Sequence, residues 1–105
     1  MGMIVRTWHG CVPVQHAEGF AKHLEITGVQ HARRTAGNLT AKVRREQQGE
    51  YEHFFLATWW QDLTAIKAFA GEHYQMAVTY PDDEQFALIS DPYVFHFEVN
   101  ALSVL

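Results

Sequence analysis

The sequence predicts an α+β fold in the order βαββαβ, with its strands in one antiparallel sheet. The chain has 105 residues, enough for a single domain over 1–105, and its 48% hydrophobic content provides a core. Segments typical of strands and helices alternate along it. Two β-α-β halves of this kind usually form a four-stranded sheet with helices on one face, the ferredoxin-like arrangement.

The N-terminal half begins with a strand and a long helix. Residues 3–12 are rich in β-branched and aromatic side chains and predict the first strand, which Pro13 suits as an end. From there to about Arg34 the pattern is helical, and a bend or break is expected near Gly28. The apolar face of this helix is predicted to hold Ala17, Phe20, Ala21, Leu24 and Gly28.

A hairpin follows this helix. Residues 39–47 alternate between apolar and polar side chains and predict a half-buried strand, and Gly49 suits the turn to a third strand over 51–60. Asp62 is then a good N-cap for a helix that ends at Gly71. Its buried stripe is predicted to be Leu63, Ile66, Phe69 and Ala70.

The last third is predicted to hold two short helices and a strand. We expect helices over 72–80 and 82–90, because Pro81 ends the first and acidic residues open the second. A turn at Asp91–Pro92 leads to an alternating strand over 93–99.

Adjacent tryptophans in the third strand bear on how the chain assembles. Trp59 and Trp60 must point to opposite faces of the sheet, so both faces need cover. The phase of the strands stays open. On the last strand the apolar series is expected under the helices: Tyr93, Phe95, Phe97 and Val99.

The helix-free face also requires cover. Were Trp8, Phe54, Leu56 and Trp60 on it, they would form a patch larger than monomers tolerate. A second copy packed face to face is the simplest cover, and the alternative is a loop or crossing helix, for which the chain has no spare segment. Mixed charges are expected to pair at the interface of this homodimer: Arg6, Lys42, Arg44 and Glu98.

Composition narrows the function classes. The net charge of -4 argues against nucleic acid or an anionic membrane as partner, and no apolar run approaches a membrane span. The single cysteine, Cys11, excludes an internal disulfide, and the N-terminus shows no secretion signal, so a cytoplasmic location is expected. Paired Cys/His metal spacing is lacking, so we expect no metal site.

Three stretches carry a resemblance to a known family: MIVRTWHG (3–10), TWWQDLTAIKAFAGEHYQMAVTYPDDEQF (58–86) and DPYVFHFEV (91–99). With them, nearly the whole chain resembles the antibiotic biosynthesis monooxygenase superfamily of small dimeric α/β-barrel proteins. The resemblance implies a homodimeric barrel. It leaves the activity open, since this superfamily includes cofactor-free quinone-forming monooxygenases, haem-degrading enzymes, isomerase-like relatives and members without known activity.

The haem-degrading branch can be compared residue by residue. It uses an asparagine on the first strand, a tryptophan late in the helix after the third strand and a histidine about ten residues on. Approximate alignment places Thr7, Phe69 and Thr79 there, and none matches. His73 lies too early in the chain to replace the axial ligand. Haem breakdown by that mechanism is not expected, while haem binding through another histidine stays open.

Histidines among aromatic residues are the candidate chemistry. Cofactor-free oxygenation needs a base near neutral pKa, a dry aromatic pocket and hydrogen-bond donors, and histidine suits the base. His9 and His96 are the candidate catalytic bases, and no cofactor is expected. Substrate-binding roles are predicted for Thr7, Trp59, Trp60, Phe69, His73 and Tyr74, with Tyr80 a further possible donor.

Three functions stay open from the sequence. The first is a cofactor-independent monooxygenase-like enzyme acting on a small planar aromatic compound. The second is a binding or sensing protein for a hydrophobic small molecule, and the third is haem binding. Structural roles compete with the functional ones: Trp59 and Trp60 also suit the core and the interface, and His96 suits a buried hydrogen-bonded position.

Overall fold

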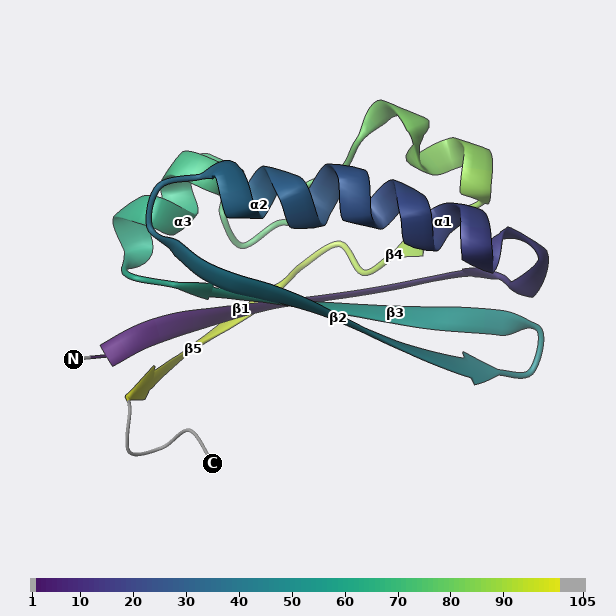
Figure 1. Ribbon diagram of the computed structural model, residues 1–105, viewed down its shortest axis with the longest axis horizontal. Coiled ribbons are helices and arrows are strands. Elements are labelled where there is room, and N and C mark those ends of the chain that lie inside the picture. The colour runs from purple at the N-terminus through teal and green to yellow at the C-terminus, as the bar shows by residue number, and fades with distance from the viewer. Residues whose placement is uncertain (1, 101–105) are drawn as a thin grey trace.

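The sheet at the centre of the molecule confirms the predicted fold class. The computed structural model describes residues 2–100 (Figure 1). Its elements are β1 (Gly2–Pro13), η1 (Val14–His16), α1 (Ala17–Leu24), η2 (Glu25–Val29), α2 (Gln30–Arg34), β2 (Asn38–Gln48), β3 (Tyr51–Trp60), α3 (Leu63–Ala70), η3 (Pro81–Phe86), β4 (Ile89–Ser90) and β5 (Phe95–Asn100). The helices lie over one face of the sheet (Figure 1).

Strand order follows the ferredoxin-like pattern. The sheet runs β2-β3-β1, and both β4 and β5 pair with the free edge of β1, all antiparallel. The two-residue β4 pairs with the Gly10–Cys11 end of β1, and β5 pairs with its first half. The fourth strand position is therefore filled by two separate segments.

Register decides which face each side chain occupies, because directly paired residues point the same way. Trp60 pairs with Ile4, and Leu56 pairs with Trp8, so these side chains lie under the helices. Trp59 pairs with Val5 on the other face. The two tryptophans thus point apart as predicted, and the alternative that placed Trp8 and Trp60 in a helix-free patch is wrong.

The core consists of two clusters beneath the helices. One lies under α1 and η2 and centres on Phe20, Leu24 and Phe54. The other lies under α3 and centres on Trp60, Ile66 and Phe69. Each large side chain buried here contributes about 1.5–3 kcal/mol to stability. The fully buried Trp60 indole donates from Nε1 to Thr58 Oγ1 over 2.8 Å, so its polar atom has a partner.

The long helix is interrupted where glycine predicted it. A π-helical segment, η2, separates α1 from α2, and Gly28 lies within it. A Cβ atom on Gly28 would lie 3.2 Å from Leu24 Cδ1 and 3.3 Å from Leu56 Cδ2, so glycine lets the helix approach the sheet.

The predicted helix after β3 is present with both its caps. Asp62 accepts a hydrogen bond from the Ala65 N–H over 2.9 Å, and Gly71 ends α3 at a positive φ of 86°. Ile66 and Phe69 are buried as predicted, whereas Leu63 is 37% exposed because it faces solvent on the first turn.

The helices predicted over 72–80 and 82–90 are wrong in large part. Residues 72–80 form a turn and an extended stretch whose main chain bonds to the segment before β5: Ala77 N–H donates to Pro92 O over 3.0 Å, and Val94 N–H to Gln75 O over 2.9 Å. Only 81–86 is helical, as the 3₁₀ segment η3, which ends at Ala87 with a φ of 54°. Long-range main-chain pairing here overrides local helix signals.

The phase predicted for the last strand is also wrong. Phe95 and Phe97 point away from the helices and are 68% and 52% exposed, while Val94 is buried under the helices. His96 turns inward because it pairs with Arg6, which binds main-chain carbonyls on the helix side. We call the helix-free side of the sheet the uncovered face; its exposed aromatic residues are Tyr51, Phe55, Tyr93, Phe95 and Phe97.

Within residues 2–100, no helix is both long enough and apolar enough to traverse a bilayer.

Candidate functional site

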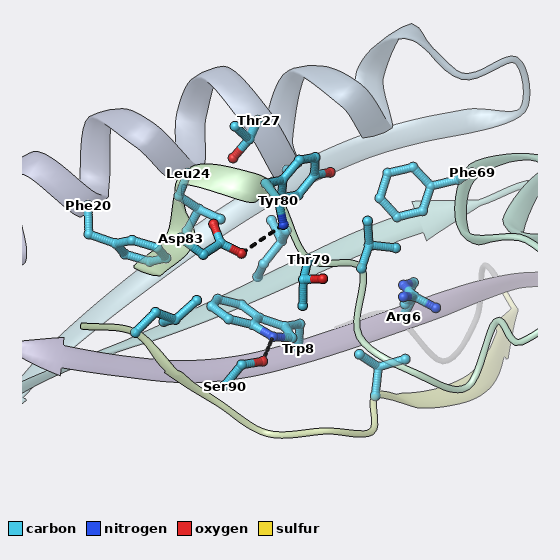
Figure 2. Close-up of a pocket in the computed structure, with 15 residues that line it drawn as sticks. Arg6, Trp8, Phe20, Leu24, Thr27, Phe69, Thr79, Tyr80, Asp83 and Ser90 are labelled. Carbon is cyan, nitrogen blue, oxygen red and sulfur yellow. Dashed lines mark hydrogen bonds between the residues drawn. The ribbon is translucent and has the colours of Figure 1, made fainter. Parts of the chain in front are cut away.

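A cleft opens between the sheet and the helical layer (Figure 2). It holds about 480 Å³ of empty space, part of which is open solvent, and its enclosed part is narrow. The lining residues come from β1, the long helix, β3, α3 and the segment 78–94: Arg6, Trp8, Phe20, Leu24, Thr27, Gly28, Leu56, Phe69, Val78, Thr79, Tyr80, Asp83, Leu88, Ser90 and Val94. Its walls are mostly apolar, and the polar groups come mainly from β1 and residues 79–90.

Trp8 forms the floor of the cleft. Its indole Nε1 donates to Ser90 Oγ over 2.8 Å, and Ser90 Oγ donates to the Asp91 carbonyl over 2.8 Å, which fixes the ring (Figure 2). Gly10, two residues on, leaves room for it: a Cβ atom there would lie 2.5 Å from Trp8 Cζ2. A flat aromatic surface results, suited to stacking against a planar ligand.

Arg6 brings a buried positive charge to the cleft. Its side chain is 4% exposed and lies over the Phe69 ring, with Cζ 5.6 Å from the ring centroid. Nη1 donates to the Tyr74 carbonyl and to His96 Nε2, the latter over 3.2 Å, and Nη2 donates to the Met76 carbonyl over 3.1 Å. These contacts fix the guanidinium between β1 and residues 74–76.

Asp83 and Tyr80 bring the other ionisable groups of the lining. Asp83 Oδ1 accepts from His23 Nε2 over 2.7 Å, and its Oδ2 accepts from the Tyr80 N–H over 2.9 Å. The Tyr80 hydroxyl lies 2.8 Å from His31 Nδ1. Since Arg6 is bonded to His96, each of the three ionisable lining residues is hydrogen-bonded to a histidine behind the wall. Such supporting contacts hold functional side chains in fixed orientations.

The electrostatics keep these groups in defined charge states. Burial lowers the pKa of Arg6 to about 10, a shift that Tyr80 opposes, so the guanidinium stays charged at neutral pH. Burial raises the pKa of Tyr80 to about 12, with Asp83 adding to the rise, so its hydroxyl stays protonated. Burial, and then the charge of Arg6, lowers the pKa of His96, which is therefore a neutral acceptor.

Half of the predicted substrate-binding residues lie at or beside the cleft. Phe69 lines it, and Trp60 packs against Phe69 from below with ring centroids 5.2 Å apart. Tyr74 contributes its carbonyl to Arg6, and its ring meets His96 edge-on at 5.4 Å. His96, a predicted base, directs its Nε2 lone pair at Arg6 rather than into the cleft.

The remaining predicted residues lie elsewhere. Thr7, His9 and Trp59 are on the opposite side of the sheet, and His73 is exposed in the turn after α3. Sequence alternation placed Thr7 and His9 on one face but left open which face the helices cover.

His9 has its own hydrogen-bonded setting on the uncovered face. Its Nδ1 lies 3.1 Å from Asp91 Oδ2, and its Nε2 lies 2.8 Å from His53 Nδ1. The His9 and His53 rings are nearly parallel, 8° apart, with centroids at 5.0 Å. The imidazole of His9 adjoins a second hollow of about 590 Å³, lined in part by Phe55, Tyr93 and Phe95.

Sequence reasoning missed Arg6, Trp8 and Asp83 as cleft residues. Arg6 was expected at a subunit interface, but the register places it on the covered face. The signal that could have identified Arg6 is its place in "IVRTW", within a strand otherwise rich in β-branched and aromatic residues. An arginine buried with such neighbours needs a partner, so its position indicates a polar site inside the fold. Asp83 gave no comparable signal, since three consecutive acids suit any helix start.

Within residues 2–100, no three histidine, cysteine, aspartate or glutamate side chains are grouped to hold a metal ion. The described lining of the cleft offers a buried cation, a carboxylate, a phenol and aromatic walls.

The fold is shared with solved structures across nearly the whole chain. A protein from Deinococcus radiodurans assigned as an antibiotic biosynthesis monooxygenase is 20% identical, with a TM-score of 0.58 over 95% of this chain and 93% of that one. SnoaB, a cofactor-independent oxygenase from Streptomyces nogalater, is 18% identical, with a TM-score of 0.53 over 96% of this chain and 94% of that one.

A third structure of this fold binds haem. MhuD, a haem degrader from Mycobacterium tuberculosis with two haems in its active site, is 19% identical, with a TM-score of 0.55 over 100% of this chain and 97% of that one. No protein-family profile and no curated protein matches the sequence. The chain therefore has the fold of the antibiotic biosynthesis monooxygenases, as its sequence predicted.

Proposed function

We propose that the cleft binds a small planar aromatic compound with a phenolic hydroxyl and oxygenates it with O₂ without a cofactor. One observation carries the proposal: the cleft has aromatic walls, and each ionisable residue that lines it is hydrogen-bonded to a histidine. Its fold, shared with a cofactor-independent oxygenase, is consistent with this. Since the enclosed part of the cleft is narrow, we infer that its lining must shift to admit a substrate.

The proposed reaction starts with a proton transfer. The Asp83 carboxylate, supported by His23, takes the phenolic proton, and the resulting phenolate passes one electron to O₂. Superoxide and the phenoxyl radical then combine at a ring carbon that bears hydrogen, forming a C–O bond. The hydroperoxide loses water, with the ring hydrogen leaving as a proton, and a quinone remains. One phenol and one O₂ give one quinone and one H₂O.

His96 and His9 keep proposed roles of different kinds. His96 accepts a hydrogen bond from Arg6, so we assign it the positioning of Arg6 rather than proton abstraction. His9 faces the second hollow together with Asp91, so a role as base for His9 requires a ligand in that hollow. Thr7 and Trp59 lie on the same face as His9, and we propose an interface role for Trp59.

We also propose that the protein is a homodimer joined through its uncovered face. Five large aromatic side chains among the described residues are exposed there, and such patches on soluble proteins usually mark contacts with another chain. A second sheet packed across a two-fold axis would bury both copies of the patch at once.

Oxygen uptake by the purified protein with a series of dihydroxynaphthalenes tests the oxygenase proposal. We expect uptake with wild type, and a loss of about 10²–10⁴-fold in Asp83→Asn, the range that general bases contribute. Asp82→Asn is the matched control, because Asp82 is exposed on the same segment and binds only Gln85 among the described side chains. Undiminished uptake in a folded Asp83→Asn protein would remove Asp83 as the base.

The alternative functions give different readings in the same sample. Binding without oxygen uptake indicates a non-catalytic binding or sensing protein. A shift of the Soret band when haem is mixed with the protein indicates haem binding. The described lining of the cleft contains no histidine that could serve as an axial ligand.

A further inference from the structure

Arg6 carries a buried charge without a counter-charge. Its side chain is 4% exposed, yet its partners among the described residues are two main-chain carbonyls and a neutral histidine. Every ion pair between described residues involves other side chains. Buried charges in proteins are normally paired with an opposite charge, because carbonyl dipoles offset only part of the loss of hydration.

The hydrogen-bond inventory of Arg6 leaves donors available. A guanidinium has five N–H groups, and the described contacts use two on Nη1 and one on Nη2. Nε makes no bond to the described residues. Arg6 lines the cleft, and the cleft is therefore where this donor can meet a ligand.

We propose that Arg6 makes the cleft selective for planar aromatic anions, whose ionised oxygen supplies the missing counter-charge. The oxygen belongs to a phenolate or an aromatic carboxylate, and either accepts charge-assisted hydrogen bonds from a guanidinium. This inference rests on the cleft being the ligand site of the proposed function, and it specifies the charge of what enters.

The charges of the cleft also set the orientation of such a ligand. Figure 2 shows Arg6 and Asp83 toward opposite ends of the cleft, with Trp8 between them. A ligand anion is attracted to the Arg6 end and repelled by the Asp83 carboxylate, while its aromatic body lies along Trp8. In the proposed oxygenase reaction, the hydroxyl that Asp83 deprotonates is then a second one, at the opposite end of a dihydroxyaromatic substrate. The pKa of Arg6, lowered to about 10 by burial, still leaves the guanidinium charged at neutral pH.

A purely structural role for Arg6 makes a different prediction. If Arg6 only ties residues 74–76 to β1, its loss lowers stability and weakens charged and uncharged ligands alike. Selective loss of anion binding requires contact between guanidinium and ligand. Comparing an anion with its neutral ester separates the two.

The test measures binding of 2-naphthoate and its methyl ester by titration calorimetry. We expect naphthoate to bind wild type at least tenfold more tightly than the ester, and Arg6→Met to reduce that ratio to about one. Arg33→Met is the matched control, since Arg33 is exposed and outside the cleft lining, and it should keep the ratio. Titrating 2-naphthol through its own ionisation distinguishes a phenolate preference from a carboxylate one.

The wild-type ratio decides the matter even if Arg6→Met fails to fold. Equal binding of naphthoate and ester, or binding of neither, overturns the inference. Anion-selective binding without oxygen uptake keeps this inference and removes the oxygenase proposal, whereas oxygen uptake without anion selectivity does the reverse.

Discussion

The cleft depends on single residues, and on Gly10 in particular, whose missing side chain leaves room for the Trp8 indole. Gly10 cannot be replaced by a larger residue without a shift, because the Trp8 indole lies where a side chain at position 10 would begin. The Arg6 and Trp8 side chains alternate with Thr7 and His9, so one strand supplies both a cleft wall and the uncovered face.

Gly10→Ala tests this packing. A methyl group would lie 2.5 Å from Trp8 Cζ2 and 3.1 Å from Leu88 Cδ1, so the indole must shift. We expect a loss of about 1–3 kcal/mol in the free energy of unfolding, typical of overpacking, together with weaker ligand binding. Urea unfolding measures the stability, and the change in tryptophan fluorescence on adding ligand measures the binding.

Gly2→Ala is the control on the same strand, because its added Cβ would meet only Val99 O at an ordinary 3.7 Å. If Gly10→Ala matches Gly2→Ala in stability and fluorescence, the Trp8 packing argument is wrong.

At the scale of the elements, two histidines of the long helix hold the segment 79–90 against it, beside the cleft. His23 and His31 lie on α1 and α2, and they bond to Asp83 and Tyr80 of the 79–90 segment. Phe86 of η3 adds ring contacts with His23 and with the helix core. The segment therefore depends on side-chain contacts with the helix more than on its own secondary structure.

Stability should fall in mild acid because of His31 and His96. Burial is the main cause that lowers both pKa values below the ordinary 6.5, with Arg34 and Arg6 adding to it. Below pH 6.5 the unfolded chain therefore binds more protons than the folded one, and the free energy of unfolding falls as pH falls.

Urea unfolding at about pH 7.5 and about pH 5.5 measures this loss, since histidine changes charge within that range. Replacing both residues, as His31→Gln with His96→Gln, should make the pH dependence shallower. His16→Gln is the control, on η1 outside the cleft lining. An equal slope in the double variant would show that other groups cause the loss.

The whole molecule presents its largest exposed aromatic residues on one side. Phe95 and Phe97 on β5 lie beside Thr7 and Val5 of β1, with Phe55 and Trp59 on β3 next to them. Covering this face with a second copy would remove several large side chains from water on each subunit.

Phe95→Asp tests the assembly. We expect wild type to sediment as a dimer at micromolar concentration and Phe95→Asp to shift to a monomer, because the carboxylate would be buried without a partner. Ile26→Asp is the control, since Ile26 is similarly exposed but on the helix. A monomeric wild type would contradict the homodimer and the reason given for the exposed aromatic face.

The fold could be predicted because local signals agree with it. The strand over 39–47, the Asp62 cap, Gly49 in a turn and Gly71 after a helix each depend on signals over a few residues, and each lies where predicted. The half-buried alternation expected in 39–47 is wrong in part, since Ala41 is buried but Leu39 and Val43 are exposed. Helical periodicity alone placed Phe69 on the buried side of its helix. By contrast, Asp83 could not be placed, since its role depends on His23, sixty residues away.

The sequence by itself determined the order of the main strands and of the two helical regions between them, and the opposed directions of Trp59 and Trp60. Only the tertiary structure decided which face the helices cover, and hence that Arg6 and Trp8 line the cleft while His9 and Phe95 do not. The physical reason is that side chains of a strand point to the two faces in turn, so the sequence pattern is the same whichever of the two series lies under the helices. In the folded chain, strand pairing and the hydrogen bonds of the buried Arg6 decide which series lies under the helices.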